Sequence, residues 1–123
     1  MQVPIWKEGE YLFASLLTGL SDVEFLHFYD NLIHQVTVHK PKGVIVDASY
    51  VDILDSYATR MLNEMAVGVK KEGGMIVVIG LRSDVFSAMN QLGLNLKIES
   101  VPTVKEALTK LNHQYDDTMK SNG

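Results

Sequence analysis

Residues 43–60, GVIVDASYVDILDSYATR, decide the fold of this chain because they join a strand to an amphipathic helix through a short loop. The segment 43–49 contains a continuous apolar run, which is typical of a central strand covered on both faces. After Asp55 the apolar residues recur at helical spacing and form a core stripe of Ala58, Met61, Leu62, Met65 and Val69. A buried strand that leads directly into a helix favours an α/β fold.

The flanking sequence continues this alternation of strands and helices. The first two strands form an expected hairpin around Gly9, and Ser21 with Glu24 and Thr103 with Glu106 have the form of capping boxes. The sequence therefore predicts one α/β domain over residues 1–113, with a mixed, mainly parallel sheet of about five strands and about four helices. A polar tail over 114–123 is expected to fray. Strands are predicted over 3–6, 11–17, 43–49, 75–80 and 94–101, and helices over 22–38, 56–71, 83–92 and from 104 onward.

Two of the predicted helices have distinct faces. The opposite face of helix 56–71 carries Ser56, Arg60, Asn63 and Val67. Val67 is apolar where solvent is expected and shares its face with Ser56, so this face is a candidate docking surface. In helix 22–38 the side expected to meet the core contains Phe25, Leu26, Phe28, Tyr29, Leu32, Ile33 and Val36.

Composition narrows the classes of function. The chain has 123 residues, a formal net charge of −4 and no cysteine. The negative charge argues against a general nucleic-acid binder, and the lack of cysteine excludes disulfides and thiolate chemistry. The first residues include Lys7, Glu8 and Glu10, unlike a signal peptide, and no apolar run approaches the roughly 20 residues that cross a bilayer. We therefore expect a cytoplasmic protein without nucleic-acid or membrane partners.

Motifs of catalysis and cofactor binding are absent from the sequence, which has no Walker A loop, dinucleotide fingerprint or nucleophile elbow. His27 and His34 fall opposite the apolar side of their helix, so they are expected to be surface residues rather than metal ligands. Asp47, Asp52 and Asp55 are close in sequence, but a phosphoryl-aspartate site would also need an acidic pair after the first strand. Asp47 either is a functional group at the end of its strand or accepts hydrogen bonds from loop amides. No enzyme activity, cofactor or metal is predicted.

Asp55 and Ser56 stand where the second predicted helix begins. If Asp55 is the N-cap, its carboxylate accepts the first amides of the helix and the Ser56 hydroxyl is left accessible. A phosphate on Ser56 would add about −1.5 to −2 charge at a helix N-terminus, where anions are favoured, and would repel a bound partner. The residues by themselves favour the simpler interpretation that Ser56 is itself the cap.

Three stretches of the chain resemble the STAS domain, the anti-anti-sigma-factor fold. They are GVIVD at 43–47, the Asp55–Ser56 pair, and KEGGMIVVIG at 71–80, and the similarity extends to about Leu111. The resemblance implies a four-helix domain with a mainly parallel sheet. It also implies that Ser56 is phosphorylated by a partner serine kinase.

The residues after Ser56 differ from the usual pattern of this family. Classical anti-anti-sigma proteins have Ser or Thr and then Gly, whereas Tyr57 and Ala58 stand here. This departure resembles the small scaffold-type members of the bacterial stressosome, which assemble with sensor paralogues and sequester a switch kinase until it phosphorylates them.

The resemblance therefore implies a self-associating, non-enzymatic regulator of the general stress response. Its expected partners are a serine/threonine switch kinase and STAS-domain sensor paralogues. A free anti-anti-sigma factor that binds an anti-sigma kinase and is inactivated at Ser56 is the alternative, and an α/β enzyme or nucleotide-binding protein is a third possibility. The expected partner surface consists of Asp52, Asp55, Ser56, Arg60, Asn63 and Val67.

Overall fold

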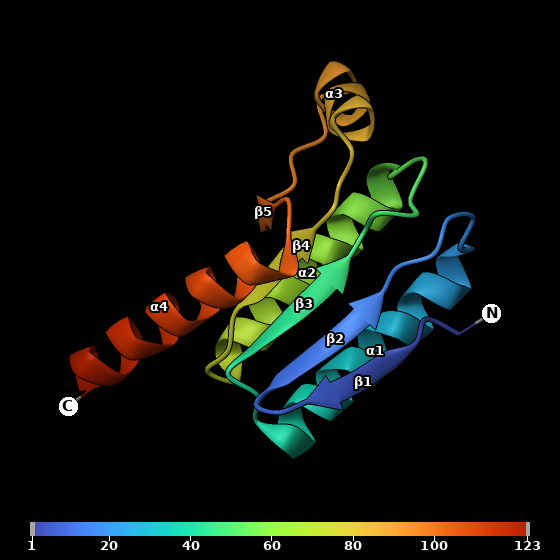
Figure 1. The fold of residues 1–123 in the computed structure, drawn as a ribbon. Helices are drawn as coiled ribbons and strands as arrows, with labels where there is room; N and C mark the ends of the chain where they lie inside the picture. The colour runs from blue at the N-terminus through green and yellow to red at the C-terminus, as the bar shows by residue number, and fades with distance from the viewer. Residues whose placement is uncertain (1, 123) are drawn as a thin grey trace.

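A single five-stranded sheet, in the order β1-β2-β3-β4-β5, organises the chain (Figure 1). The computed structural model describes the backbone of residues 2–122 and the side chains of residues 2–114. Strand β1 runs antiparallel to β2, and the other pairs are parallel, so the predicted α/β class with a mixed sheet and four helices is confirmed. The elements are β1 (Ile5–Glu8), β2 (Tyr11–Ser15), α1 (Asp22–His39), β3 (Gly43–Asp47), α2 (Ser56–Lys71), β4 (Ile76–Ile79), α3 (Ser83–Gln91), β5 (Glu99–Val101) and α4 (Val104–Asn122).

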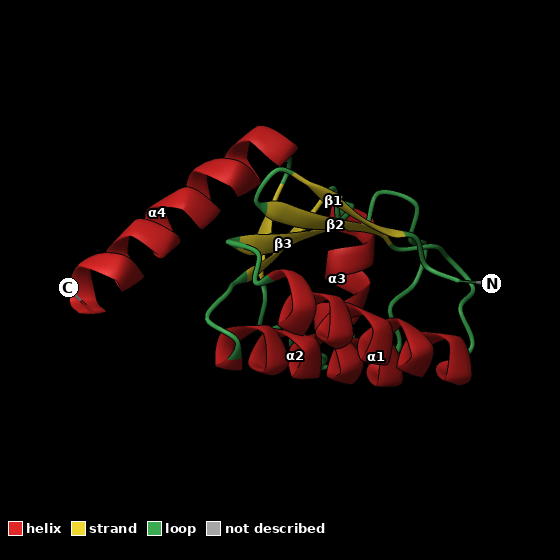
Figure 2. Ribbon diagram, turned by 90° about the horizontal axis from the view of Figure 1, so that it is seen from below, coloured by secondary structure: helices red, strands yellow, loops and turns green. Residues whose placement is uncertain are grey.

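Helices cover both faces of the central strands, as the continuous apolar runs predict. Helices α1 and α2 form one layer, and α4 lies on the other side of the sheet (Figure 2). Side chains alternate along β3, so that Val44 and Val46 belong to the large core under α1 and α2. Ile45 points the other way and joins the smaller core under α4. The sheet is therefore the middle layer of the domain.

The α1–α2 layer begins and packs as the sequence predicts, with one exception. Ser21 and Glu24 form the capping box at the start of α1, and the predicted stripe of α2 is buried. The two helices approach closely at Gly68, where an added Cβ would lie 2.6 Å from Ile33 Cδ1. Leu26 is 43% exposed, so its predicted place in the core is wrong. The buried side of α1 is narrower than the wheel indicates and consists of Phe25, Phe28, Leu32 and Val36.

Helix α4 starts at the cap Thr103, whose hydroxyl oxygen accepts the amide hydrogen of Glu106. It anchors to the sheet through Ala107 and Leu111, and its C-terminal part extends beyond the strands in both views (Figures 1 and 2). The helix runs through residue 113 without a break to Asn122. Fraying of the tail over 114–123 stays a prediction. The side chains of residues 115–123 lie outside the described part of the chain.

Candidate functional site

The first turn of α2 is organised by Asp55 and leaves Ser56 exposed. Asp55 has the extended backbone of an N-cap residue, and its Oδ1 accepts the amide hydrogen of Ala58 at 2.8 Å. Ser56 is the first residue of the helix, and its side chain is exposed. The interpretation of Ser56 as the cap is therefore wrong, because the capping bond belongs to its neighbour.

This geometry predicts different costs for two neighbouring substitutions. Asp55→Ala should lower the free energy of unfolding by about 1 kcal/mol, because it removes the capping bond. Ser56→Ala should change it by less than about 0.5 kcal/mol, since an exposed hydroxyl without a capping role is replaced. Asp55→Asn keeps a capping acceptor and serves as the control. Urea denaturation measures all three, and a larger loss for Ser56→Ala would contradict the assignment of the cap.

Thr59 lies directly behind this turn and is enclosed. Its side chain is 4% exposed, and its Oγ1 donates to the Asp55 carbonyl oxygen at 2.8 Å. A kinase could not reach this hydroxyl without opening the first turn of α2. Ser56 is consequently the accessible hydroxyl of the pair.

The loop between β3 and α2 presents large apolar side chains beside Ser56. Val51 and Leu54 are buried and anchor the loop to the core, whereas Tyr50 and Ile53 point outward. Tyr50 is 66% exposed and Ile53 75%, so two large apolar side chains of one short loop stand in solvent. Sequence reasoning missed Tyr50 and Ile53. A signal was available in the sequence of this short loop. It contains four large apolar residues, more than the two that anchor it to the core, so some of them had to be exposed.

Arg82 connects this loop to the start of α3. Its guanidinium group donates a hydrogen bond to Asp52 Oδ1 at 3.2 Å and two hydrogen bonds to the Asp84 carboxylate at 3.1 and 3.2 Å. The bonds to Arg82 lower the pKa of Asp84, and the two carboxylates, Asp84 first, raise the pKa of Arg82. All three side chains are exposed, so the cluster contributes little to stability. It does partly neutralise Asp52, a role with no local signal because Asp52 and Arg82 are 30 residues apart.

The remaining predicted site residues lie further along α2. The Arg60 guanidinium lies 5.4 Å from the centre of the Tyr57 ring, and Val67 is 51% exposed. Both ends of the Asn63 side-chain amide are hydrogen-bonded within the chain. Its Nδ2 donates to the Asn95 carbonyl oxygen at 2.9 Å, and its Oδ1 accepts the amide hydrogen of Lys97 at 2.7 Å. The structure thus places Asp52, Asp55 and Ser56 together, with Arg60 one turn away. The two hydrogen bonds of Asn63 join α2 to the segment 95–97. A place for Asn63 on a partner surface stays a prediction.

A groove of about 340 Å³ lies beside Ser56, between the β2–α1 connection and the β3–α2 loop. Apolar side chains such as Leu16, Leu20 and Phe25 form much of its wall. Asp22, Asp52 and Asp55 also line it, and none of the described lining residues is basic. An apolar groove with an acidic border fits a protein segment that carries an apolar side chain next to a lysine or arginine.

Asp47 organises the end of β3 rather than facing a ligand. Its Oδ1 accepts hydrogen bonds from both the amide and the hydroxyl of Ser49, the second of the two alternatives that the sequence left open. Across the described residues, no three histidine, aspartate or glutamate side chains lie close enough to hold a metal ion. In the same part of the chain, no helix is both long and apolar enough to cross a bilayer.

Comparisons with known structures find the same fold in other proteins. A serine-to-glutamate variant of Moorella thermoacetica RsbS is 25% identical, with a TM-score of 0.77 over 92% of this chain and 97% of that one. A chain from the molecular architecture of the stressosome, a signal integration and transduction hub, is 24% identical, with a TM-score of 0.71 over 89% and 96%. The anti-sigma factor antagonist SpoIIAA in its unphosphorylated form shares 7% identity and a TM-score of 0.67 over 88% and 94%.

A search of curated protein sequences found no significant match. The model of the STAS domain, however, matches residues 13–107, which span the strands β3 and β4, the Asp55–Ser56 pair and the whole of α2. The matched region therefore includes the three parallel strands β3, β4 and β5, most of β2, and the capped helix α2 with the loop that precedes it. The chain belongs to the STAS domain family.

Proposed function

We propose that this STAS protein is a non-enzymatic, cytoplasmic scaffold of a bacterial stressosome that sequesters a serine/threonine switch kinase and releases it when Ser56 is phosphorylated. The observation that carries the proposal is the exposed Ser56 hydroxyl, which stands free beside the capping residue Asp55. The 25% identity to the Moorella protein over 92% of the chain supports this particular role within the family.

The electrostatics of the first turn of α2 explain how a phosphate would act as a switch. The free amides and dipole at a helix N-terminus favour an anion, so the domain should stay folded when Ser56 is modified. A bound partner would meet the new charge next to Asp52 and Asp55, both exposed. Repulsion and the cost of desolvating these charges would fall on the complex and weaken it.

The proposed partner surface surrounds Ser56. Asp52, Asp55 and Arg60 supply charge, and the outward side chains of Tyr50 and Ile53 supply apolar contact area. Val67 and Asn63 extend the predicted surface along α2. STAS-domain sensor paralogues and further copies of this chain are the proposed companions in a large assembly, as the likeness to stressosome proteins suggests.

Intact-mass spectrometry after incubation with ATP and the candidate kinase tests the proposal. The wild type should gain one phosphate, Ser56→Ala should gain none, and Thr59→Val should still gain one because the Thr59 hydroxyl is buried. Size-exclusion chromatography before and after phosphorylation should show release of the kinase from the wild type alone. A folded wild type that takes no phosphate from a kinase active on another substrate would contradict the proposal.

The alternative within the same family is a free anti-anti-sigma factor, which shares the fold of this chain with the structure of SpoIIAA. Native mass separates the two functions. A scaffold should form a large assembly with sensor paralogues, whereas a free antagonist should remain a monomer or dimer that binds an anti-sigma kinase. Phosphorylation of Ser56 is common to both.

A further inference from the structure

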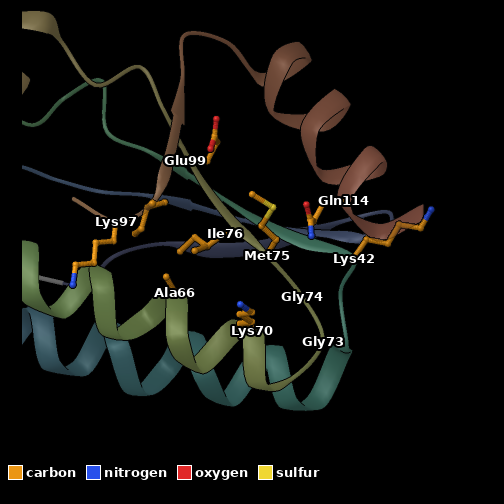
Figure 3. A pocket seen from close by; sticks show the side chains of 11 residues that line it. Lys42, Ala66, Lys70, Gly73, Gly74, Met75, Ile76, Lys97, Glu99 and Gln114 are labelled. Atoms are coloured by element: carbon orange, nitrogen blue, oxygen red, sulfur yellow. The ribbon is translucent and has the colours of Figure 1, made fainter. Parts of the chain in front are cut away.

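A second hollow, of about 460 Å³, lies at the edge of the sheet opposite Ser56 (Figure 3). It is bordered by the C-terminal half of α2, by the beginnings of β3 and β4, and by the segment that leads into β5. Ser56 and Lys70 are separated by about 21 Å along α2 at 1.5 Å per residue. The hollow is therefore independent of the proposed switch and of the groove beside it.

Positive charge gathers around this hollow although the whole chain has a net charge of −4. Lys42, Lys70 and Lys97 come from three different segments, and Glu99 is the one carboxylate among the lining residues that the structure describes. Lys110 Nζ forms an ion pair with Glu99 Oε1 at 2.8 Å, and Lys42 Nζ forms one with Glu10 Oε2 at 3.1 Å.

Lys70 and Lys97 form no ion pair with any described residue. Lys70 also stands in the last turn of α2, where a cation complements the helix dipole. Lys97 belongs to no helix and has no such role. The lining thus carries two cations that no described carboxylate neutralises.

The floor of the hollow is apolar. Ile76 and Ile98 are buried there, and Met75 and Ala66 are half-buried (Figure 3). Ala66 precedes Lys70 by one turn on the same side of α2, and its small side chain leaves the space open. A ligand in this hollow would meet hydrocarbon below and ammonium groups at the border.

The hollow is also held in place from both sides. Helix α2 is fixed by its buried stripe, and the two bonds from Asn63 fasten the segment 95–97 to it. Lys97 is therefore carried on a segment tied to α2, the helix that also bears Lys70. Backbone amides are not offered to a ligand at the nearby turn, because Gly73 and Gly74 donate to the carbonyls of Lys70 and Val69.

We propose that this hollow binds a small organic anion with an apolar or aromatic body. The body would cover the floor formed by Met75 and Ile76, and the anionic group would pair with Lys70 and Lys97. An inorganic anion would have no free backbone amides to bind at this turn, and it has no apolar part to cover the floor. The geometry thus favours an amphiphilic anion over inorganic phosphate.

Fluorescence titration with 8-anilinonaphthalene-1-sulfonate tests the site on the full chain. The wild type should bind the dye saturably, and the affinity should fall as salt is raised. The double variant Lys70→Gln/Lys97→Gln should bind at least about tenfold more weakly, because it loses two charge-assisted contacts. Lys105→Gln, which removes an exposed lysine from α4 outside the hollow, should bind as the wild type does.

Two further measurements locate the ligand and fix its class. Methyl NMR signals of Ala66 and Met75 should shift on addition of the dye. Ala66→Leu, which fills the hollow with another good helix former, should abolish binding. Inorganic phosphate should not displace the dye at matched ionic strength. Absence of saturable binding, equal affinity in the double variant and in Lys105→Gln, shifts confined to other methyls, or efficient displacement by phosphate would each overturn the proposal.

Discussion

Gly80→Ala should lower the free energy of unfolding by about 2–5 kcal/mol, one of the largest effects expected of a single methyl group in this chain. Gly80 follows β4 and has φ of +71°, a left-handed conformation that costs a residue with a Cβ about 1–2 kcal/mol. An added Cβ would also overlap Ser49 Oγ and lie 3.3 Å from Asp47 Oδ1. Crowding of this kind typically costs a further 1–3 kcal/mol.

Gly93 provides the matched control for this substitution. Its φ is +72°, and an added Cβ there has no atom within 4 Å. Gly93→Ala should therefore cost only the conformational part, about 1–2 kcal/mol. Urea denaturation of both variants isolates the steric part as the difference between them. Equal losses at the two glycines would contradict the steric explanation.

Ser49 offers a second test of the same contact. In a Ser49→Gly background the crowding oxygen is gone, so the cost of Gly80→Ala should fall toward that of Gly93→Ala. The contact also has a functional side. Ser49 is held by Asp47 at the start of the loop that presents Ser56, so a shift of Ser49 would move the proposed partner surface. If the proposed function holds, Gly80→Ala should weaken binding of the proposed kinase even though Gly80 lies outside that surface.

The order and type of the elements could be predicted because their signals are local. The apolar run of β3 and the stripe of α2 each lie within one segment, as does the Asp55 carboxylate three residues before the amide that it caps. The burial of β3 and β4 on both faces could be predicted from the apolar sequence of each strand alone. The proposed phosphorylation site needed one addition, the family resemblance, because the same two residues also allow a serine cap.

Contacts between distant segments had no such local signal. Asn63 bonds the backbone of Asn95 and Lys97, and the prediction of an exposed docking residue could not anticipate that α2 and this segment would meet. Arg82 meets Asp52 across the carboxyl edge of the sheet in the same way. Leu26 shows the limit of the wheel, since the width of the buried side of α1 depends on where its neighbours end. Such features follow from how the layers are placed and not from periodicity.

The second large effect is expected where α4 meets the sheet. Leu111→Ala should lower the free energy of unfolding by about 3 kcal/mol, within the usual range of about 2–5 kcal/mol for a buried leucine. Leu111 is 1% exposed and packs in the smaller core with Ile45, Val77 and Ile79. That core has few members, so it has little capacity to close around a cavity. Leu108→Ala, a half-buried position on the same helix, should cost less and serves as the control.

The contact between α4 and β3 can also be tested with a substitution that adds a methyl group at Gly43. An added Cβ at Gly43 would lie 2.6 Å from Leu111 Cδ2, so Gly43→Ala alone should destabilise the wild type. In the Leu111→Ala background the same methyl group would enter vacated space and should cost little or stabilise. The double-mutant cycle should therefore show a favourable coupling of about 1–3 kcal/mol.

Additive losses in this cycle would mean that α4 does not rest on β3 as described. A favourable coupling would instead establish that α4 is part of the domain's core, with Leu111 placed against Gly43, the first residue of β3. The glycine at the start of β3 would then be explained by the close approach of a helix. Glycine weakens a strand in general, so its presence at this position has a specific steric cause.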